Sequence, residues 1–423
     1  MKLMELSFFF YYLVPVFLKR ASPAARGSGC SAQEGLRQMA EGFDIVIVGA
    51  GSAGCVLAER LSADGAARVL LLEAGGWDWN PLVRIPYGAR KLFEHRAYYW
   101  PDFSEPERFA DNQRMLVGHG KVVGGTSSLN FMAHARGHPL DYERWVAQGA
   151  TGWGYEDVLP FFKECESWAG GEDRWRGGSG PLGAAISRYT DELARGWLGA
   201  ASERGYALTD DYNGGQNEGF AHIQYTIRGG RRVSSARAFL YPALRRANLV
   251  VRTGALATRV LFRGNRAAGV EYVKNGKVHA VDVSSRVVIS AGAINTPHLL
   301  MLSGVGPADH LRETGIAPVA DLPVGSTLED HLAYPIYWRR KQPDPFHQTL
   351  RLDRVAANML RAQLFGSGPA ANLPGALFGF IKTDAELAQP DIQLVISMIS
   401  PEANIWYPFV NRPGPGTFGL KVN

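Results

Sequence analysis

The sequence predicts an α/β fold built on a parallel sheet, and three features of the chain predict it. Residues 43–48 form a nearly continuous apolar run, which is typical of a strand buried on both faces. A glycine-rich turn, a helical pattern and a second apolar run, residues 69–72, follow directly. A third buried run, residues 287–290, is again followed by a helical pattern. Strands that alternate with helices in this way indicate βαβ units.

The first turn has the spacing G-x-G-x-x-G over residues 49–54. Gly49 permits a tight turn, Gly51 lets a pyrophosphate approach the backbone, and Gly54 lets the helix pack closely on the strand. The phosphates would then meet unpaired N–H groups and the positive end of the helix dipole. Glu73 ends the next strand, where a carboxylate can accept hydrogen bonds from ribose hydroxyls. Because that carboxylate would repel a 2′-phosphate, the unit predicts a dinucleotide other than NADP.

The helix between these two strands has an apolar face at a spacing of four residues. Ala53, Leu57 and Leu61 share that face, Val56 lies beside them, and Asp64-Gly65 is expected to end the helix. A glycine turn kept only for packing is the alternative interpretation of the motif. The unit by itself does not separate FAD from NAD.

Composition excludes several classes of protein. A chain of 423 residues can bury a large core and is expected to hold two structural domains. The net charge of +5 is small and forms no dense basic block, so nucleic-acid binding has no support. The three cysteines are odd in number and lack metal-ligand spacing. We therefore expect no disulfide framework and no zinc site, and a reducing compartment such as the cytoplasm is the default.

The N-terminus carries an isolated apolar segment. Leu6–Leu18 is strongly apolar, but its 13 residues fall short of the roughly 20 that span a bilayer. We expect a disordered or spurious extension ahead of the start near Phe43, with the apolar region of a signal peptide as the alternative. Residues 1–42 are therefore assigned to an N-terminal extension, and export or membrane association stays open.

From residue 255 the pattern changes to strands joined by tight turns. Apolar runs at 256–262, 268–273 and 278–283 are separated by Gly264-Asn265 and Asn275-Gly276. Asn-Gly between such runs is a strong hairpin signal, so we expect an antiparallel meander.

The strand expected at 287–290 leads into a second helix. Thr296 is expected to cap this helix with Pro297 at the first helical position, and Gly304 is expected to end it. A second helix N-terminus would then lie beside the first glycine turn.

The remaining segments carry structural patterns and no chemical motif. A helix is expected at 355–364, and strands at 392–399 and 418–422. Residues 161–235 are rich in Gly, Trp and Arg. Three arginines in that stretch are expected to form a solvated face: Arg228, Arg231 and Arg232.

A second glycine-rich stretch covers residues 118–130. Gly124 and Gly125 are followed by hydroxyl side chains, which suits a close backbone approach to a flat ring and its phosphates. A tight turn satisfied by its own Ser and Thr side chains is the alternative.

The same stretch resembles a known family. Residues 120–130, running on to Arg136-Gly137, look like the first signature of the glucose–methanol–choline (GMC) flavoprotein oxidoreductases. Residues 142–145 and 152–160 are similar to that family's next segment, and residues 292–306 match its second signature throughout. The resemblance implies FAD as the cofactor.

The resemblance also implies the domain organisation. It implies an α/β fold with a Rossmann-like FAD-binding domain of the GMC type and a second, α+β substrate-binding domain. Residues 43–160 and 236–330 would form the FAD-binding domain. Residues 161–235 and 331–423 would form the substrate-binding domain, whose sheet roofs the flavin and which is expected to be truncated at its C-terminus.

The cofactor site is assigned from the first crossover and from the resemblance. The first crossover contributes Gly49, Ala50, Gly51, Ser52, Ala53, Gly54, Glu73 and Ala74. The resemblance adds Val122, Gly124, Gly125, Asn130, Phe131, Met132 and Ala133 beside the flavin and the diphosphate, Val260 near the adenine, and Ala291 and Gly292 at the second crossover. For Val260 the sequence alone favours packing in the core.

Two positions depart from the family pattern. Some members carry a His immediately before the Asn as a covalent link to the flavin, but Leu129 stands here, which implies non-covalent FAD. His134 stands where an aromatic residue or Ala is expected, so the contacts at that point are open.

The family's chemistry requires a base. A His near the alcohol oxygen would take the hydroxyl proton while hydride passes to the flavin. By resemblance this His lies in a late H-x-x-G-T motif, which none of the ten histidines occupies, so the catalytic residue is unknown and expected beyond residue 423. His331 is interpreted as a hydrogen-bonded structural residue, and His134 is not assigned as a base.

The leading hypothesis is therefore an FAD-dependent oxidoreductase that acts on the CH–OH group of a small alcohol, similar to choline dehydrogenases. The electron acceptor, quinone or oxygen, stays open. Whether the enzyme is a dehydrogenase or an oxidase stays open as well. Three alternatives remain: a flavin-binding protein without turnover, a lyase that holds FAD without net redox, and an NAD-dependent dehydrogenase. The last explains only residues 43–73.

Overall fold

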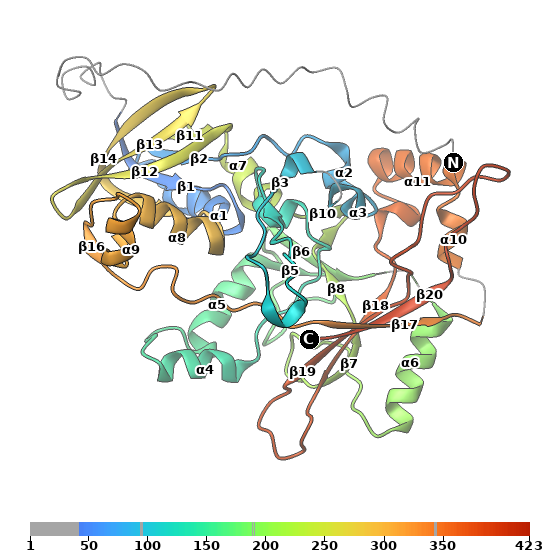
Figure 1. Cartoon of the computed structure of the whole chain (residues 1–423). Coiled ribbons are helices and arrows are strands. Elements are labelled where there is room, and N and C mark those ends of the chain that lie inside the picture. Colours follow the sequence, from blue (N-terminus) through green and yellow to red (C-terminus); the bar gives the residue numbers. More distant parts are fainter. Residues whose placement is uncertain (1–41, 94–95, 188, 190, 342–344) are drawn as a thin grey trace. The chain divides into compact units, whose positions relative to one another are not determined.

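The computed structural model describes residues 42–93, 96–187, 189, 191–341 and 345–423 (Figure 1). The apolar segment expected near the N-terminus and Cys30 lie outside the described residues. No helix within the described ranges combines the length and the apolar character needed to cross a bilayer.

A six-stranded sheet carries the first crossover. Its order is β11-β2-β1-β14-β13-β12, with parallel pairing from β11 through β14 and antiparallel pairing among β14, β13 and β12. The strands are β1 Gly42–Val48, β2 Val69–Leu72, β11 Leu249–Arg252, β12 Ala255–Arg263, β13 Arg266–Lys274 and β14 Lys277–Ile289. The predicted α/β fold with a parallel sheet is confirmed.

Strand β14 corrects one expectation. The separate strands expected at 278–283 and 287–290 are one continuous strand, Lys277–Ile289. Its first half pairs with β13 and its second half with β1, and Asp282 has a partner on each side. The strand continues through the polar residues 284–286, where the apolar pattern stops, although the pairing with β1 shifts register between Phe43 and Ile45 at this point.

The meander itself agrees with its turn residues. Asn275 and Gly276 have φ values of 51° and 73°. Two consecutive positive φ values are the requirement of the hairpin turn that Asn-Gly favours. Strands β13 and β14 therefore meet as expected.

Helix α1, Ser52–Leu61, covers one face of the sheet, but its buried residues differ from those expected. Cys55 and Ala58 are fully buried, whereas Ala53 is exposed. The helix packs so closely on the sheet that only small side chains fit beneath it. Leu57 and Leu61 are partly buried at its flank.

Helix α8, Gly292–Leu302, follows β14 and covers the other face through Leu299. The expectation of an N-cap at Thr296 is wrong, because the helix begins one turn earlier and its N-cap is Ala291. Pro297 lies inside the helix, where its missing N–H removes a single hydrogen bond near the first turn. Gly304, with φ of 86°, follows the C-cap Ser303 as expected.

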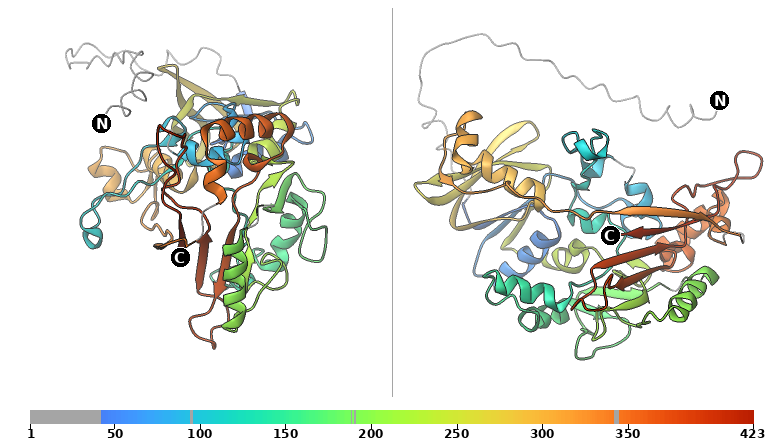
Figure 2. Two further views of the ribbon diagram at one scale, coloured as in Figure 1. Left: turned by 90° about the vertical axis from the view of Figure 1, so that its right-hand side faces the viewer. Right: turned by 60° about the horizontal axis from the view of Figure 1, so that its bottom comes forward.

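A second, antiparallel sheet has the order β17-β20-β19-β18-β7. Its strands are β7 Gly219–His222, β17 Tyr334–Arg339, β18 Ala376–Ile381, β19 Ile392–Ser397 and β20 Thr417–Val422. Helix α6, Glu192–Glu203, packs on it through Ala194 and Ala201, and Figure 2 shows α6 alongside these strands. The strands expected at 392–399 and 418–422 are confirmed. The division into two domains stays a prediction.

A small sheet, β5-β6-β8, joins segments of the middle of the chain. Its strands are β5 Glu166–Trp168, β6 Leu182–Ile186 and β8 Gln224–Tyr225. The longer remaining helices are α4 Pro139–Ala147, α5 Tyr155–Cys165 and α11 Leu352–Phe365, and α11 contains the helix expected at 355–364.

Short elements complete the described fold. The helices among them are α2 Pro81–Arg84, α3 Gly88–Phe93, η1 Arg96–Tyr98, η2 Arg108–Ala110, η3 Gly125–Ser128, η4 Ala236–Leu240, α7 Tyr241–Ala243, α9 Ala308–Glu313, α10 Pro345–Thr349 and η5 Pro369–Ala371. The short strands are β3 Tyr99–Trp100, β4 His119–Gly120, β9 Ile227–Arg228, β10 Arg231–Arg232, β15 Val305–Gly306 and β16 Ala320–Asp321.

Candidate dinucleotide-binding site

The two glycine-rich stretches are in direct contact. The Gly124 N–H donates to the Ala50 carbonyl at 2.7 Å. A Cβ added to Gly125, whose φ is +54°, would lie 2.8 Å from the Cα of Gly51. Only residues without side chains allow this approach. The structure thus joins the turn after β1 to a loop that is remote in sequence.

The turn after β1 has the tight geometry that its sequence predicts. Gly49 has φ of +97°. A Cβ added to Gly54 would lie 1.9 Å from the Gly49 carbonyl oxygen, so the helix contacts the turn that precedes it. A Cβ added to Gly51 would have the Ser290 carbonyl oxygen as its nearest neighbour, at 3.9 Å. The second glycine therefore has free space beside it, and the third has none.

The second crossover opens at the same edge of the sheet. Val48 and Ile289 are paired in the parallel register of β1 and β14, and the Ser290 hydroxyl donates to the Gly49 carbonyl at 3.0 Å. Helices α1 and α8 therefore begin side by side. Neither N-cap, Gly51 nor Ala291, makes a side-chain capping hydrogen bond. Their first N–H groups are thus available to an anionic ligand.

A cavity of about 1100 Å³ lies between these crossovers. This exceeds the usual range of small-molecule sites, about 300–1,000 Å³, and suits a ligand as long as a dinucleotide. Half of the predicted cofactor residues line it: Gly49, Gly51, Ser52, Ala53, Glu73, Ala74, Gly125, Ala291 and Gly292.

The other predicted residues do not line this cavity. Ala50, Gly54, Val122, Gly124 and Met132 are buried beside or behind it, whereas Asn130, Phe131 and Ala133 are exposed in the segment that follows the second glycine loop. Val260 is also buried, and its N–H donates to the Ser303 hydroxyl at 2.8 Å. The meander lines the cavity instead through Ala255, Leu256, Ala257 and Thr258.

Glu73 is fixed at the rim of the first turn. Its two carboxylate oxygens accept hydrogen bonds from Ala50 N–H and Gly75 N–H, each at 2.8 Å. Burial raises the pKa of the Glu73 carboxyl to about 6, and the two N–H groups oppose that rise. The carboxylate lines the cavity, where lone pairs not used by the backbone can accept further hydrogen bonds.

The raised pKa of Glu73 predicts a pH dependence of stability in the ligand-free protein. Its ordinary pKa is 4.5, so the folded protein holds this proton more tightly than the unfolded chain does. The resulting stability is complete below pH 4.5 and disappears as the pH rises through about 6. Between pH 4 and 7, we expect wild type to lose up to about 2 kcal/mol relative to Glu73→Gln, measured by urea unfolding. Parallel pH dependences of the two proteins would contradict this.

His119 and Asn295 close one side of the cavity. The Asn295 side-chain amide lies 3.2 Å from His119 Nε2, and His119 Nδ1 lies 3.1 Å from the Val117 carbonyl oxygen. Since that carbonyl accepts from Nδ1–H, Nε2 is the acceptor for Asn295. His119 also stacks on Trp100. These contacts join α8 to the start of the second glycine-rich stretch, and sequence patterns gave no signal for them.

The family follows from comparison with known proteins. The sequence pattern described as GMC oxidoreductase matches residues 43–333. The chain belongs to the GMC oxidoreductase family.

Relatives and solved structures support this membership. An oxygen-dependent choline dehydrogenase of Rhizobium etli (strain CIAT 652) is 42% identical over 83% of this chain and 64% of its own length. The mitochondrial choline dehydrogenase of Homo sapiens is 43% identical over 83% of this chain and 60% of its own length. The chain thus spans less than two thirds of these relatives.

Among solved structures, pyridoxine 4-oxidase from Mesorbium loti has a TM-score of 0.74 at 29% identity, over 90% of this chain and 70% of its own. A formate oxidase of Aspergillus oryzae RIB40, in which FAD modification was studied, has a TM-score of 0.77 at 26% identity. The match covers 90% of this chain and 72% of the oxidase. Both likenesses extend beyond the matched family pattern into the second sheet.

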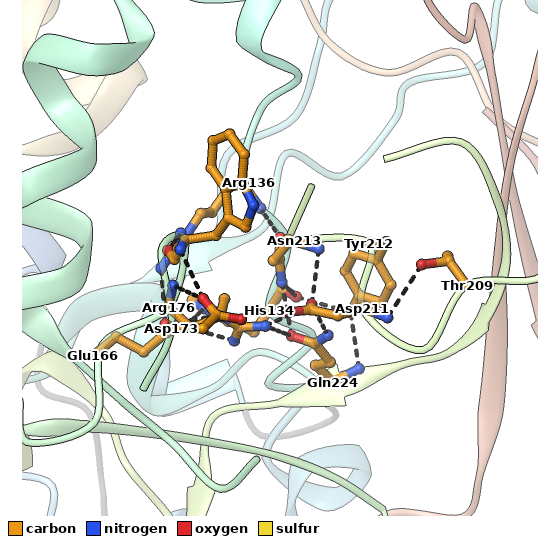
Figure 3. A network of polar contacts seen from close by, with 12 residues as sticks. His134, Arg136, Glu166, Asp173, Arg176, Thr209, Asp211, Tyr212, Asn213 and Gln224 are labelled. Carbon is orange, nitrogen blue, oxygen red and sulfur yellow. Dashed lines mark hydrogen bonds and ion pairs between the residues drawn. The ribbon is translucent and has the colours of Figure 1, made fainter. Parts of the chain in front are cut away.

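A buried polar network follows the first GMC signature (Figure 3). Glu166 and Arg176 are 1% and 0% exposed, and Arg176 donates to both Glu166 oxygens at 2.7 and 2.9 Å. Arg136 donates to Glu166 at 2.8 Å, and His134 Nε2 lies 3.0 Å from it. The network also includes Asp211, Asn213 and Gln224. It anchors the backbone of residues 134–136 to the small sheet.

The network sets the charge of Glu166 and the role of His134. Burial acts to raise the pKa of Glu166, but hydrogen bonds from His134 and Arg176 and the charges of Arg136 and Arg176 outweigh it and hold that pKa at about 2. The His134 N–H also donates to the Gln224 carbonyl, and its carbonyl accepts from Tyr212. His134 therefore serves as a structural partner. Sequence patterns missed this network because its members are scattered through the middle of the chain.

Arg232 corrects another expectation. It was expected on a solvated face with Arg228 and Arg231, but it is only 4% exposed. It lies on the short strand β10 and donates to backbone carbonyls of Val83 and Ser127. Arg228 is exposed as expected. The spacing of these arginines around the Gly229-Gly230 turn gave no indication that one of them points inward.

Two cysteines lie in the described part of the chain, and no cluster of metal-ligating side chains was found there. No group of three or more His, Cys, Asp or Glu side chains there is arranged to hold a metal ion. Cys55 and Cys165 are free thiols. Burial raises the pKa of the Cys55 thiol to about 12. That thiol is therefore unreactive at neutral pH.

Proposed function

We propose that this chain is an FAD-dependent oxidoreductase that acts on the CH–OH group of a small alcohol. The observation that carries the proposal is the cavity of about 1100 Å³ at which two uncapped helix N-termini and two contacting glycine loops converge. This arrangement suits a long ligand with a negatively charged centre. An NAD-dependent dehydrogenase would leave the second glycine loop without a role.

The residues present fit FAD. The N–H groups at the start of α1, with Gly51 beside them, would hold the diphosphate, and Glu73 would accept hydrogen bonds from the adenosine ribose. Gly125 supplies a bare backbone next to Gly51 for the other half of the cofactor. Glu73 also disfavours a 2′-phosphate by charge repulsion. Of the remaining assigned residues, Asn130 to Ala133 are proposed to lie along the flavin ring.

The flavin is proposed to be held without a covalent bond. Leu129, the position at which some family members carry a linking His, is fully buried in an apolar cluster with Val83, Leu92 and Val122. Its side chain has no nucleophilic atom. Precipitation of the purified protein with acid should therefore release all yellow flavin into the supernatant. Colour that stays in the pellet would contradict the proposal.

When bound, FAD supplies the acceptor for a hydride from the alcohol carbon while the hydroxyl proton passes to a base. We assign no base among the described residues. The chain's own contribution is to bind and orient the cofactor. The names of the relatives make choline and similar small alcohols the first substrates to test, with oxygen or a quinone as the electron acceptor.

The test of the proposed function is reduction of the bound flavin. Full-length protein, loaded with FAD, should lose its absorbance near 450 nm when choline or a panel of primary alcohols is added without oxygen. Reoxidation by air or by a soluble quinone then identifies the acceptor. Protein that takes up no FAD refutes the proposal. Protein that binds FAD but is reduced by no alcohol would instead be a flavin-binding protein without turnover or a non-redox lyase.

A further inference from the structure

Arg232 is a buried cation with no acidic partner in the described structure. Its side chain donates from Nε to the Val83 carbonyl at 2.9 Å and from Nη1 to the Ser127 carbonyl at 3.1 Å. Its Nη2 atom is buried and has no hydrogen-bond partner. Burial lowers the pKa of the guanidinium to about 10, so it stays charged at neutral pH. A buried charge and an unpaired donor both cost stability, and neither is needed to pack a core.

Arg232 also determines how Asn130 is oriented. Its Nη1 donates to Asn130 Oδ1 at 2.8 Å, and the Met132 N–H donates to the same oxygen at 3.1 Å. Both neighbours of this oxygen are donors, so a flipped carboxamide would place its own NH₂ donors against them. This repulsion fixes the orientation of the Asn130 carboxamide. Asn130 Nδ2 therefore faces away from Arg232, and Asn130 is exposed.

The backbone at this point is strained in a way that Arg232 helps to maintain. Met132 is fully buried and has φ of +61°, the left-handed region that non-glycine residues rarely adopt. The turn that holds it is closed by the Asn130 oxygen that Arg232 also binds. Strained residues of this kind persist where the surroundings fix them, and they cluster at ligand sites. Here the strain places Asn130 and Phe131 at the surface.

The position of this unit relates it to the cofactor. The segment Ser127–Asn130 continues the loop whose Gly125 and Thr126 line the cavity. On the proposed function, a dinucleotide with its ribose at Glu73 and its diphosphate at Gly51 would extend past Gly125 toward this segment. Arg232 therefore supports the segment from behind, where the redox end of the cofactor would lie.

We propose that Arg232 is a positioning residue that orients the Asn130 side-chain amide toward the bound flavin and whose buried charge favours the reduced flavin. This inference rests on the proposed function. A hydride delivers two electrons and one proton to the ring system and adds a negative charge to it, and a fixed positive charge nearby offsets that charge. The alcohol carbon gives up that hydride and becomes a carbonyl carbon, and the hydroxyl proton passes to a base or to solvent.

The test compares Arg232→Met and Arg232→Lys with wild type in the full chain loaded with FAD. The two-electron potential is measured against a reference dye, and FAD affinity by fluorescence titration. Arg232→Met should make the flavin about tenfold harder to reduce at equilibrium, a downward shift of about 30 mV. Arg232→Lys keeps the charge but not the planar fork, so its potential should stay nearer wild type while FAD affinity falls. The matched control is Arg228→Met, at an exposed residue of the neighbouring strand β9, which should change neither.

Coupling to Asn130 separates positioning from a general structural role. In the Arg232→Lys background, the further change Asn130→Ala should cause little additional loss of FAD affinity, because the amide is already misplaced. This double variant also serves if Arg232→Met does not fold. Additive losses, or an unchanged potential in Arg232→Met, would overturn the inference with the proposed function intact. Failure of wild type to bind FAD would overturn both, and the two failures are thereby distinguished.

Discussion

A single methyl group at Gly51 should weaken FAD binding about 10- to 100-fold and leave the fold intact. The added Cβ of Gly51→Ala has no atom of the protein nearer than 3.9 Å, so the ligand-free structure accommodates it. It would, however, stand where the diphosphate approaches the N–H groups of α1. Hydrogen bonds to a charged group contribute about 1.5–3 kcal/mol each, and about 1.4 kcal/mol corresponds to tenfold in affinity. Fluorescence titration with FAD and urea unfolding measure the two effects separately.

The third glycine of the motif provides the contrasting variant. In Gly54→Ala the new Cβ would lie 1.9 Å from the Gly49 carbonyl oxygen, so both stability and FAD binding should be lost. The control is Gly196→Ala in α6, where an added Cβ meets nothing within 4 Å. This variant should bind FAD as wild type does and should be at least as stable, because Ala favours a helix over Gly. If Gly51→Ala binds FAD as wild type does, the diphosphate does not lie at this turn.

Removing the charge of Arg176 should destabilise the protein by about 3–5 kcal/mol, the usual effect of breaking a buried ion pair from one side. In Arg176→Met, Glu166 stays buried, but each of its two carboxylate oxygens loses a hydrogen bond from Arg176. The substitution also removes the ion-pair partner of Asp211. Urea unfolding at pH 7, where Glu166 is ionised, measures the loss.

An exposed neighbour supplies the control for Arg176. Arg174→Met removes an ion pair with Glu156 in which the side chains are 73% and 75% exposed. Such surface pairs contribute about 0–1 kcal/mol, so stability should hardly change. Similar losses in the two variants would contradict the view that the network anchors residues 134–136. If Arg176→Met is partly unfolded, its FAD affinity should also fall, because the backbone of residues 134–136 is then displaced.

Local patterns predicted the elements whose structure depends on near neighbours. The apolar runs of β1 and β2, the turn at Asn275-Gly276 and the glycine spacing at 49–54 all formed as expected. Local chemistry decides these features, since a positive φ or a strand buried on both faces restricts the residue types that can occupy it. The expectations failed where a distant segment supplied the partner, as in β14, which takes its pairing from β13 and then from β1.

By itself the sequence determined the first crossover, the family resemblance and the residues that can approach a diphosphate. Only the tertiary structure decided which of those residues share a cavity and that Arg232 is buried behind Asn130. It also brought Glu166, Arg176 and His134 together. The physical reason is that side-chain burial and ion pairing depend on contacts between segments remote in sequence. The spacing of residues along the chain does not predict such contacts.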